Sequence, residues 1–407
     1  MSPMALLLVL LVLAYIGSLW VSSERKRAFG SPSGVEYVVL GALLGPEALG
    51  VLGHGVMSAF EPVMMVALGW LGLVLGLECG VVGTTSAPAP RLAIGIVWTA
   101  LTAGATACAV YAAARWLRVG SESEQLVLAG ALGLVSAETT RHAVRWLGDR
   151  QVLTGPLPDL LVDIGAADDA PVMVALAFVF ALMSGPYTLF GHALGSAALF
   201  ALTLGAGVAL GTVSAWLLRR AVSPVERWTV LLGAAWLATG LAKSLGLSAL
   251  AATFALGLTV SALSHDAPRL RTQVGESEGA VLLPALLLAG AHLELPRSEA
   301  EVLLIALAIG TRVLASFLFG CCLSFRFRDR PGVASWLGAG MLSSGTLTTL
   351  VGFGLAQRAP ADVGRPALVA AVLGTLIGEL IGPAALKRAF GRTSAPPPPL
   401  ASSEVAS

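Results

Sequence analysis

Charged residues are scarce in this 407-residue chain, and their scarcity excludes several classes of protein. Only 12% of the residues are Asp, Glu, Lys or Arg, whereas 56% are hydrophobic. Water-soluble domains carry about twice that share of charge. The formal net charge is +1, so the chain lacks the strongly basic surface that a nucleic-acid partner requires. We therefore expect no nucleic acid among its partners.

Cysteine and histidine are also rare, with four and five copies. The cysteines have neither the spacing of zinc ligands nor that of a disulfide framework. The sequence shows no Ser/His/Asp set, metal-ligand cluster or phosphate-binding loop. We therefore expect no enzymatic activity, no resident metal and no cofactor.

Long uncharged runs take the place of the missing charge. Ala170–Leu218 contains no Asp, Glu, Lys or Arg, and Ser184-Gly185-Pro186 divides it into two helices. Other runs supply the ~20 residues that a spanning helix needs: Met4–Ser23, Leu92–Ala114, Ser244–Ser264 and Pro331–Gln357. The first run lacks a basic leader and a cleavage site, so we interpret it as a retained helix. The predicted fold class is an all-α, polytopic membrane protein.

The hydropathy pattern predicts thirteen transmembrane helices, at 4–23, 34–53, 60–77, 92–114, 125–144, 156–183, 187–218, 228–243, 247–264, 279–294, 301–324, 332–356 and 366–386. The positive-inside rule supports this count with the N-terminus outside. Of the 25 Lys and Arg residues, Arg312 lies within a helix, 18 lie on the inner side, and six lie at outer ends: Arg115, Arg118, Lys243, Arg297, Arg358 and Arg365. We expect one transmembrane domain over 1–392, in the inner cell membrane, and a disordered cytoplasmic tail over 393–407.

Four of the ionisable residues within the predicted spans stand out. Charge inside a bilayer is costly, so each is a candidate functional residue. Asp168 and Asp169 are adjacent in the sixth span, Arg312 lies within the eleventh, and Glu138 lies in the fifth. Two acids against one base leave a buried carboxylate that needs a proton or a cation. Glu138 fits equally well close to the inner interface, paired with Arg141 or Arg145.

Hydroxyl residues interrupt two spans. Ser136, Thr139 and Thr140 break the fifth, and the twelfth is broken near Gly345 by Ser344 and Thr348. Such residues usually bond to their own helix, but paired interruptions are typical of discontinuous helices at the midplane of inverted-repeat transporters.

Several segments resemble the monovalent cation:proton antiporter superfamily, in the branch of bacterial Na⁺/H⁺ exchangers and glutathione-gated potassium efflux systems. They occur in the family's order: GALLGPEALG at 41–50, LGLSALAATFALGLTVS at 245–261, Leu283-Pro284 with Ala289-Gly290-Ala291, and Gly378–Leu386 with its Gly382-Pro383 pair. The chain departs from the family at Glu138, where a small hydroxyl residue is usual. It departs again at Thr346 and Leu347, near which many relatives carry Glu.

The resemblance implies a dimerisation bundle, a mobile core of the fifth, sixth, eleventh and twelfth spans, and a homodimer. It implies that Asp168 and Asp169 bind the ion, with Asp169 at the expected spacing from Thr140. It also implies that Arg312 holds the first member of this pair. We expect a bidentate pair between Arg312 and Asp168, which would leave Asp169 to exchange one cation for one proton.

The predicted function is exchange of a monovalent cation, most directly Na⁺, for protons by competition at the aspartate pair. The partners are then the cation, H⁺ and the lipid bilayer. Two alternatives remain at this point: a K⁺ efflux antiporter, and a transport-inactive relative that acts as a membrane sensor or scaffold.

Overall fold

The computed structural model describes most of the predicted membrane region. The described residues are 34–85, 89–138, 161, 164–165, 167–184, 187–189, 192–264, 266–326, 341–342 and 345–391. The predicted first span at 4–23 and the predicted tail at 393–407 lie outside them.

Helices account for nearly all of the described secondary structure. They are α2 (Val35–Leu44), α3 (His54–Thr85), α4 (Ala89–Leu117), α5 (Glu122–Val135), α8 (Asp169–Met183), α9 (Ser196–Leu218), α10 (Pro224–Leu245), α11 (Ala249–Leu263), α12 (Ala267–Gly275), α13 (Glu278–Ala291), α14 (Glu299–Arg326), α16 (Thr346–Arg358) and α17 (Ala361–Gly391). Two short strands, β1 (Tyr187–Leu189) and β2 (His192–Leu194), pair antiparallel.

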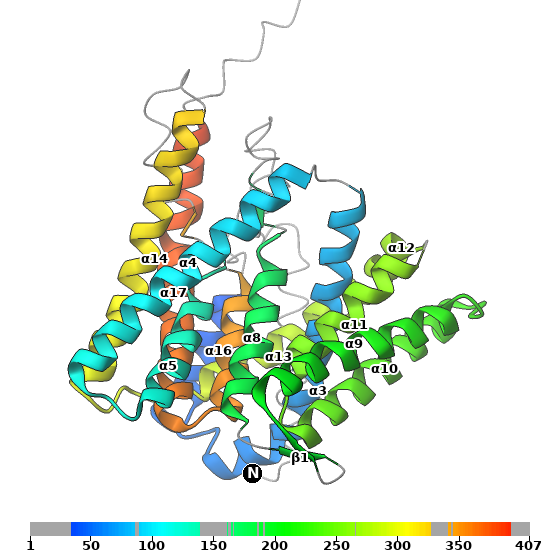
Figure 1. The fold of residues 1–407 in the computed structure, drawn as a ribbon, viewed down its shortest axis with the longest axis horizontal. Coiled ribbons are helices and arrows are strands. Elements are labelled where there is room, and N and C mark those ends of the chain that lie inside the picture. Colours follow the sequence, from blue (N-terminus) through cyan, green and yellow to red (C-terminus); the bar gives the residue numbers. More distant parts are fainter. Residues whose placement is uncertain are drawn as a thin grey trace, which may run out of the picture.

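The helices form two groups (Figure 1). In the first, α4 packs on α5 and α14, and α16 packs on α17. In the second, α11 packs on α3 and α9, and α13 packs on α2 and α3. Helix α8 contacts α5 in the first group and α9 and α11 in the second. We call the first group, together with α8, the core and the second the scaffold. Of the predicted core members, α5, α14 and α16 from the fifth, eleventh and twelfth spans lie in the first group with α4 and α17, and α8 from the sixth span contacts both groups.

Glycines allow the scaffold helices α3 and α11 to lie very close together. A Cβ on Gly76 of α3 would clash with the carbonyl oxygen of Phe254 in α11, and a Cβ on Gly257 of α11 would clash with that of Leu73 in α3. Small residues drive helix association in membranes in this way, because lipid supplies no hydrophobic force between helices. The two helices therefore depend on backbone contact along their length.

Local sequence sets where several helices begin. Ser121 and Glu124 form a capping box at the start of α5, and Ser223 and Glu226 form one at the start of α10. Each box satisfies backbone N–H groups that have no partner within the helix. The backbone N–H of Ser121 donates to Glu124, which lowers the pKa of that exposed carboxyl. These caps place both helix starts at polar boundaries of the apolar runs.

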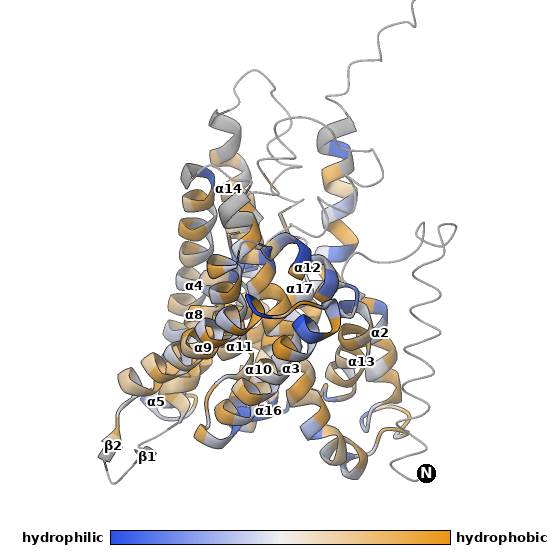
Figure 2. Cartoon of the chain, turned by 90° about the vertical axis from the view of Figure 1, so that its right-hand side faces the viewer, coloured by the Kyte–Doolittle hydropathy of each residue, from blue (hydrophilic) through white to orange (hydrophobic). Residues whose placement is uncertain are grey.

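Six described helices are long and apolar enough to cross a membrane: α3, α4, α9, α10, α14 and α17. The number rises to seven if α12 and α13, which bend by 52° at their junction, count as one span. Hydrophobic residues cover most of the helices, whereas α12 is mainly hydrophilic (Figure 2). Arg271 of α12 donates to Glu78 of α3 at 2.9 Å and to Glu278 of α13 at 3.1 Å, and these two bonds connect α12 to both helices.

The span predicted at 34–53 is helical only over Val35–Leu44, and the span predicted at 60–77 extends over His54–Thr85. Two further boundaries are wrong within apolar runs. The span predicted at 187–218 begins only at Ser196, because 187–189 and 192–194 form the short hairpin. The span predicted at 156–183 has its helix α8 starting at Asp169, after a bend at Ala167 and Asp168. Hydropathy alone cannot detect either feature, because the apolar composition continues through both.

The close contact of α3 and α11 predicts a selective effect of a single methyl group. Gly76→Ala should destabilise the protein by about 1–3 kcal/mol or more, because the two helices must separate to make room for the methyl group. Gly104→Ala in α4 is the matched control, since nothing lies within 4 Å of its added Cβ. Thermal unfolding of both variants in detergent measures the effect. An equal melting temperature for the two variants would contradict this packing.

Candidate functional site

Four ionisable side chains are buried together where described helices end inside the protein. Asp168 is 1% exposed, and Asp169, Glu138 and Arg312 are each 4% exposed. Glu138 interacts electrostatically with both Asp169 and Arg312, and Arg312 does so with Asp168. The sequence predicted these four residues as candidates, and the fold brings them within electrostatic reach of one another. We call them the buried charge cluster.

Arg312 projects from α14 toward the end of α5. One Nη donates to the carbonyl of Val135 at 3.4 Å, and the other donates to the carbonyls of Glu138 at 2.9 Å and Leu342 at 3.3 Å. The positively charged guanidinium of Arg312 thus lies at the C-terminal end of α5, where the helix dipole is negative. It also links α5 to the segment that precedes α16.

The expected bidentate pair between Arg312 and Asp168 is not the arrangement that the structure shows. Within the described residues, the guanidinium hydrogen-bonds to backbone carbonyls, and Asp168 acts on it only through its charge. The physical reason is the break after α5. Carbonyls released there need donors inside the protein, because lipid offers none.

Glu138 takes the complementary position at the start of α16. Its Oε2 accepts hydrogen bonds at 2.5 Å from both the backbone N–H and the hydroxyl of Thr348. Gly345, the N-cap of α16, supplies no side-chain cap, so Glu138 from the segment after α5 performs that role. In the alternative interpretation, Glu138 pairs with Arg141 or Arg145 close to the inner interface. Arg141 and Arg145, its partners in that alternative, lie outside the described residues.

The aspartate pair lies at the start of α8. Asp168 is the N-cap residue and Asp169 is in the first turn. A helix N-terminus favours negative charge, because its free N–H groups point toward the side chains that precede it. The pair was predicted well inside a continuous helix, but the structure places it at a helix start. The free backbone N–H groups at the start of α8, as well as side chains, therefore lie near the two aspartates.

The predicted hydroxyl residues have different positions. Thr348 contacts Glu138, whereas the Ser136 hydroxyl donates back to Leu132 at 2.8 Å within α5. Thr139, Thr140 and Ser344 lie outside the described residues. Sequence reasoning did not find the carbonyls of Val135 and Leu342, because a backbone acceptor leaves no mark in the residue types.

A family model described as "Sodium/hydrogen exchanger, transmembrane" matches residues 8–387. The chain belongs to this sodium/hydrogen exchanger family. The chain is therefore a multi-pass membrane protein, and membership supports cation/proton antiport, a transport activity and not an enzymatic one. The family resemblance predicted from the sequence segments is confirmed.

Solved structures of a remote relative share the fold. One match is to the sodium proton antiporter MjNhaP1 from Methanocaldococcus jannaschii at pH 8, with a TM-score of 0.64 and 15% identity over 96% of this chain and 97% of that one. A second structure of the same protein, an electron-microscopy map, gives a TM-score of 0.64 and 16% identity over 98% and 100%. No curated protein matches the sequence. The exchanger fold is thus confirmed at low identity.

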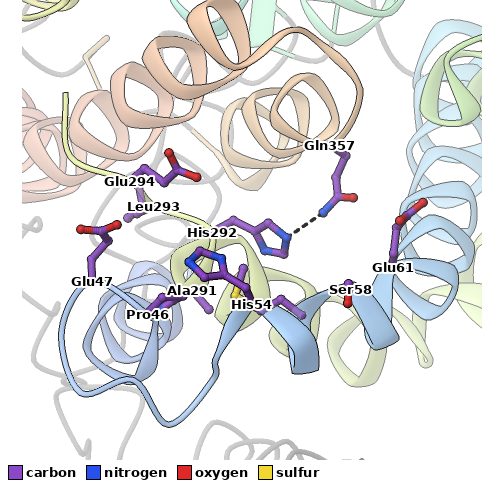
Figure 3. A pocket seen from close by; sticks show the side chains of 11 residues that line it. Pro46, Glu47, His54, Ser58, Glu61, Ala291, His292, Leu293, Glu294 and Gln357 are labelled. Atoms are coloured by element: carbon purple, nitrogen blue, oxygen red, sulfur yellow. Dashed lines mark hydrogen bonds between the residues drawn. The ribbon is translucent and has the colours of Figure 1, made fainter. Parts of the chain in front are cut away.

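A cavity of about 250 Å³ lies where the start of α3, the end of α13 and Gln357 of α16 meet (Figure 3). It is at the other end of α3 from Glu78, to which Arg271 of α12 bonds. Its lining includes Glu47, His54, Glu61, His292 and Gln357. The Nδ1 of His292 bonds to the carbonyl of Leu288 at 2.9 Å, and its Nε2 lies 3.1 Å from the amide of Gln357. A carbonyl can only accept, so Nδ1 carries the proton and Nε2 accepts from Gln357. In this arrangement of the exchanger, the contact between α13 and α16 uses the neutral form of His292.

The cluster predicts a measurable role for Glu138 in this exchanger. Glu138→Gln keeps the volume and one acceptor but removes the charge beside Arg312, so we expect lower thermal stability, by about 2 kcal/mol, and a shifted ion preference or pH optimum. Glu122→Gln, at an exposed position of α5, is the control. Unchanged ion and pH profiles for Glu138→Gln would show that this carboxylate only caps α16.

His292 predicts a pH dependence of stability. Burial lowers the pKa of His292 below its ordinary value of 6.5, so the folded state favours the neutral ring. The stability that this residue contributes is then present above pH 6.5 and falls as the pH drops below that value, where the unfolded chain binds the proton more readily. Melting curves between about pH 5 and 8 should show a smaller loss on acidification in His292→Gln than in the parent.

Proposed function

We propose that Asp169, assisted by Asp168, binds either a proton or a monovalent cation, and that this competition couples the two fluxes. The observation that carries the proposal is the burial of two adjacent carboxylates at the start of α8, inside an apolar helical protein. Two such carboxylates repel each other when both are charged. A proton or a small cation relieves this repulsion, and each ligand excludes the other.

Glu138 and Arg312 have a different role in this proposal. They compensate one another's charge at the two helix ends that meet beside the pair, and both are fixed by backbone hydrogen bonds. The aspartates are left as the groups that change their ligand. The core carries the pair through α8, so loading with either ligand lowers by one the negative charge of the element that must move against the scaffold. An unloaded, charged core would be held back by the cost of charge in the membrane.

Sodium is the cation that we propose, because the structurally similar MjNhaP1 is described as a sodium proton antiporter. Hard oxygen ligands suit a hard cation. The carboxylates supply two such ligands, and we propose the hydroxyls of Ser136, Thr139 and Thr140, which interrupt the predicted fifth span, for the remainder. We further propose the inner cell membrane as the location, with the N-terminus outside, residues 1–392 as the transmembrane domain and a homodimer as the assembly.

Asp169→Asn tests the site directly. Asn preserves the volume but neither carries the exchangeable proton nor offers a full charge to Na⁺, so exchange in proteoliposomes should be abolished while the protein stays folded. Asp362→Asn is the matched control, because Asp362 is exposed in the first turn of α17. Exchange near the parental rate in Asp169→Asn would place the ion site elsewhere, with Glu138 as the next candidate.

Direct competition also predicts how the apparent KM for Na⁺ changes with pH. Below the pKa of the site, KM should rise by up to about tenfold per pH unit, because protons occupy a growing share of the sites. Initial rates of Na⁺-driven proton release from proteoliposomes at several pH values measure this. A constant KM with a falling maximal rate would contradict a shared site.

A further inference from the structure

A second cavity of about 250 Å³ lies in the scaffold, at the ends of α9, α10, α11 and α12. It is at the far end of the scaffold from the His292 cavity, because α9 and α11 end here and α10 begins here. Arg219, Arg227, Ser264 and Asp266 provide its polar wall, and Leu218 and Leu263 are among its apolar residues. None of these residues belongs to the buried charge cluster.

The polar wall presents more donors than acceptors. Nη1 of Arg227 contacts the Asp266 carboxylate at 3.3 Å, so these two charges compensate each other. Arg219 adds a further positive charge. Within the described residues, the Nε of Arg227 and the hydroxyl of Ser264 are buried atoms without a hydrogen-bond partner. Buried donors usually have partners, so the cavity suits a ligand that is anionic and rich in acceptor oxygens.

The surroundings of the cavity are those of a membrane surface. Trp216, Val222 and Val225 are 50%, 88% and 73% exposed around it. The guanidinium of Arg220 lies 4.2 Å from the centre of the Trp216 ring. Exposed Trp and Arg of this kind are typical of the boundary between hydrocarbon and water. A ligand with a phosphate at the cavity and acyl chains along the exposed apolar faces would satisfy both environments.

The positive-inside pattern assigns this end to the cytoplasmic leaflet, where basic pockets between membrane helices bind anionic lipid headgroups. We propose that this cavity is a binding site for the phosphate of an anionic phospholipid, held by Arg219, Arg227 and Ser264. Arginine suits this ligand, because its planar fork can give two parallel hydrogen bonds to phosphate oxygens. Capping by Glu226 occupies the backbone N–H groups of Val222 and Ser223 at the start of α10, so the side chains supply the donors.

The test compares lipids and variants of the full chain. The delipidated protein in detergent is titrated with phosphatidylglycerol, phosphatidylcholine or inorganic phosphate, and both the melting temperature and the lipid retained in native mass spectrometry are measured. We expect stabilisation and retained adducts with phosphatidylglycerol only. Arg219→Gln combined with Arg227→Gln should weaken the apparent affinity about tenfold or more, and Ser264→Ala about threefold.

The control is Arg269→Gln, which removes the same charge from an exposed position of α12 outside the cavity wall. It should leave phosphatidylglycerol binding unchanged. If the double variant does not fold, Arg219→Gln alone and Ser264→Ala still decide the question, because they leave the Arg227–Asp266 pair in place. Equal stabilisation by phosphatidylcholine, full stabilisation by inorganic phosphate, or parental affinity in the cavity variants would each overturn the proposal.

Discussion

A backbone carbonyl released inside a membrane protein must find a donor within the protein, because the hydrocarbon offers none. Helix α5 ends at Val135 in the protein interior, and Arg312 from α14 donates to its carbonyl and to those of Glu138 and Leu342. These three bonds hold the break open at a fixed geometry. The buried charge cluster depends on them, because they position Glu138 at the start of α16.

The signs of the buried charges follow the helix dipoles. The Arg312 guanidinium lies at the C-terminal end of α5, Glu138 lies at the N-terminal end of α16, and the aspartates lie at the N-terminal end of α8. Each charge is thus placed where the backbone favours its sign. The dipoles lower the cost of burying the cluster without neutralising it. In our proposal the negative charge of the aspartates attracts a cation, and their burial favours binding of a proton.

The sequence predicted the composition of the cluster well and its bonding poorly. A charge inside an apolar run is visible in the sequence, so Asp168, Asp169, Glu138 and Arg312 all emerged as candidates. Their partners did not, because Arg312 bonds to backbone carbonyls and Glu138 to a backbone N–H. Side-chain chemistry alone would pair Arg312 with an acid. In the structure its N–H groups donate instead to the backbone carbonyls at the helix break.

The fold class and the family could also be predicted from the sequence, whereas several boundaries could not. Alternation of basic loops supports the helix order, and the exchanger segments identify the family. The strands at 187–189 and 192–194 and the start of α8 at Asp169 have the same apolar composition as the helices beside them. The closeness of α3 and α11 depends on which glycines face each other, and this requires the three-dimensional arrangement.

Competition at one pair of carboxylates is the central claim, and proton release on cation binding tests it most directly. Na⁺ is added to the purified exchanger in weakly buffered detergent solution near the pKa of the site, and the released protons and bound Na⁺ are both counted. The account predicts release of up to about one proton per bound Na⁺, with the release and the binding lost together in Asp169→Asn. Saturable Na⁺ binding without proton release across the working pH range would contradict it.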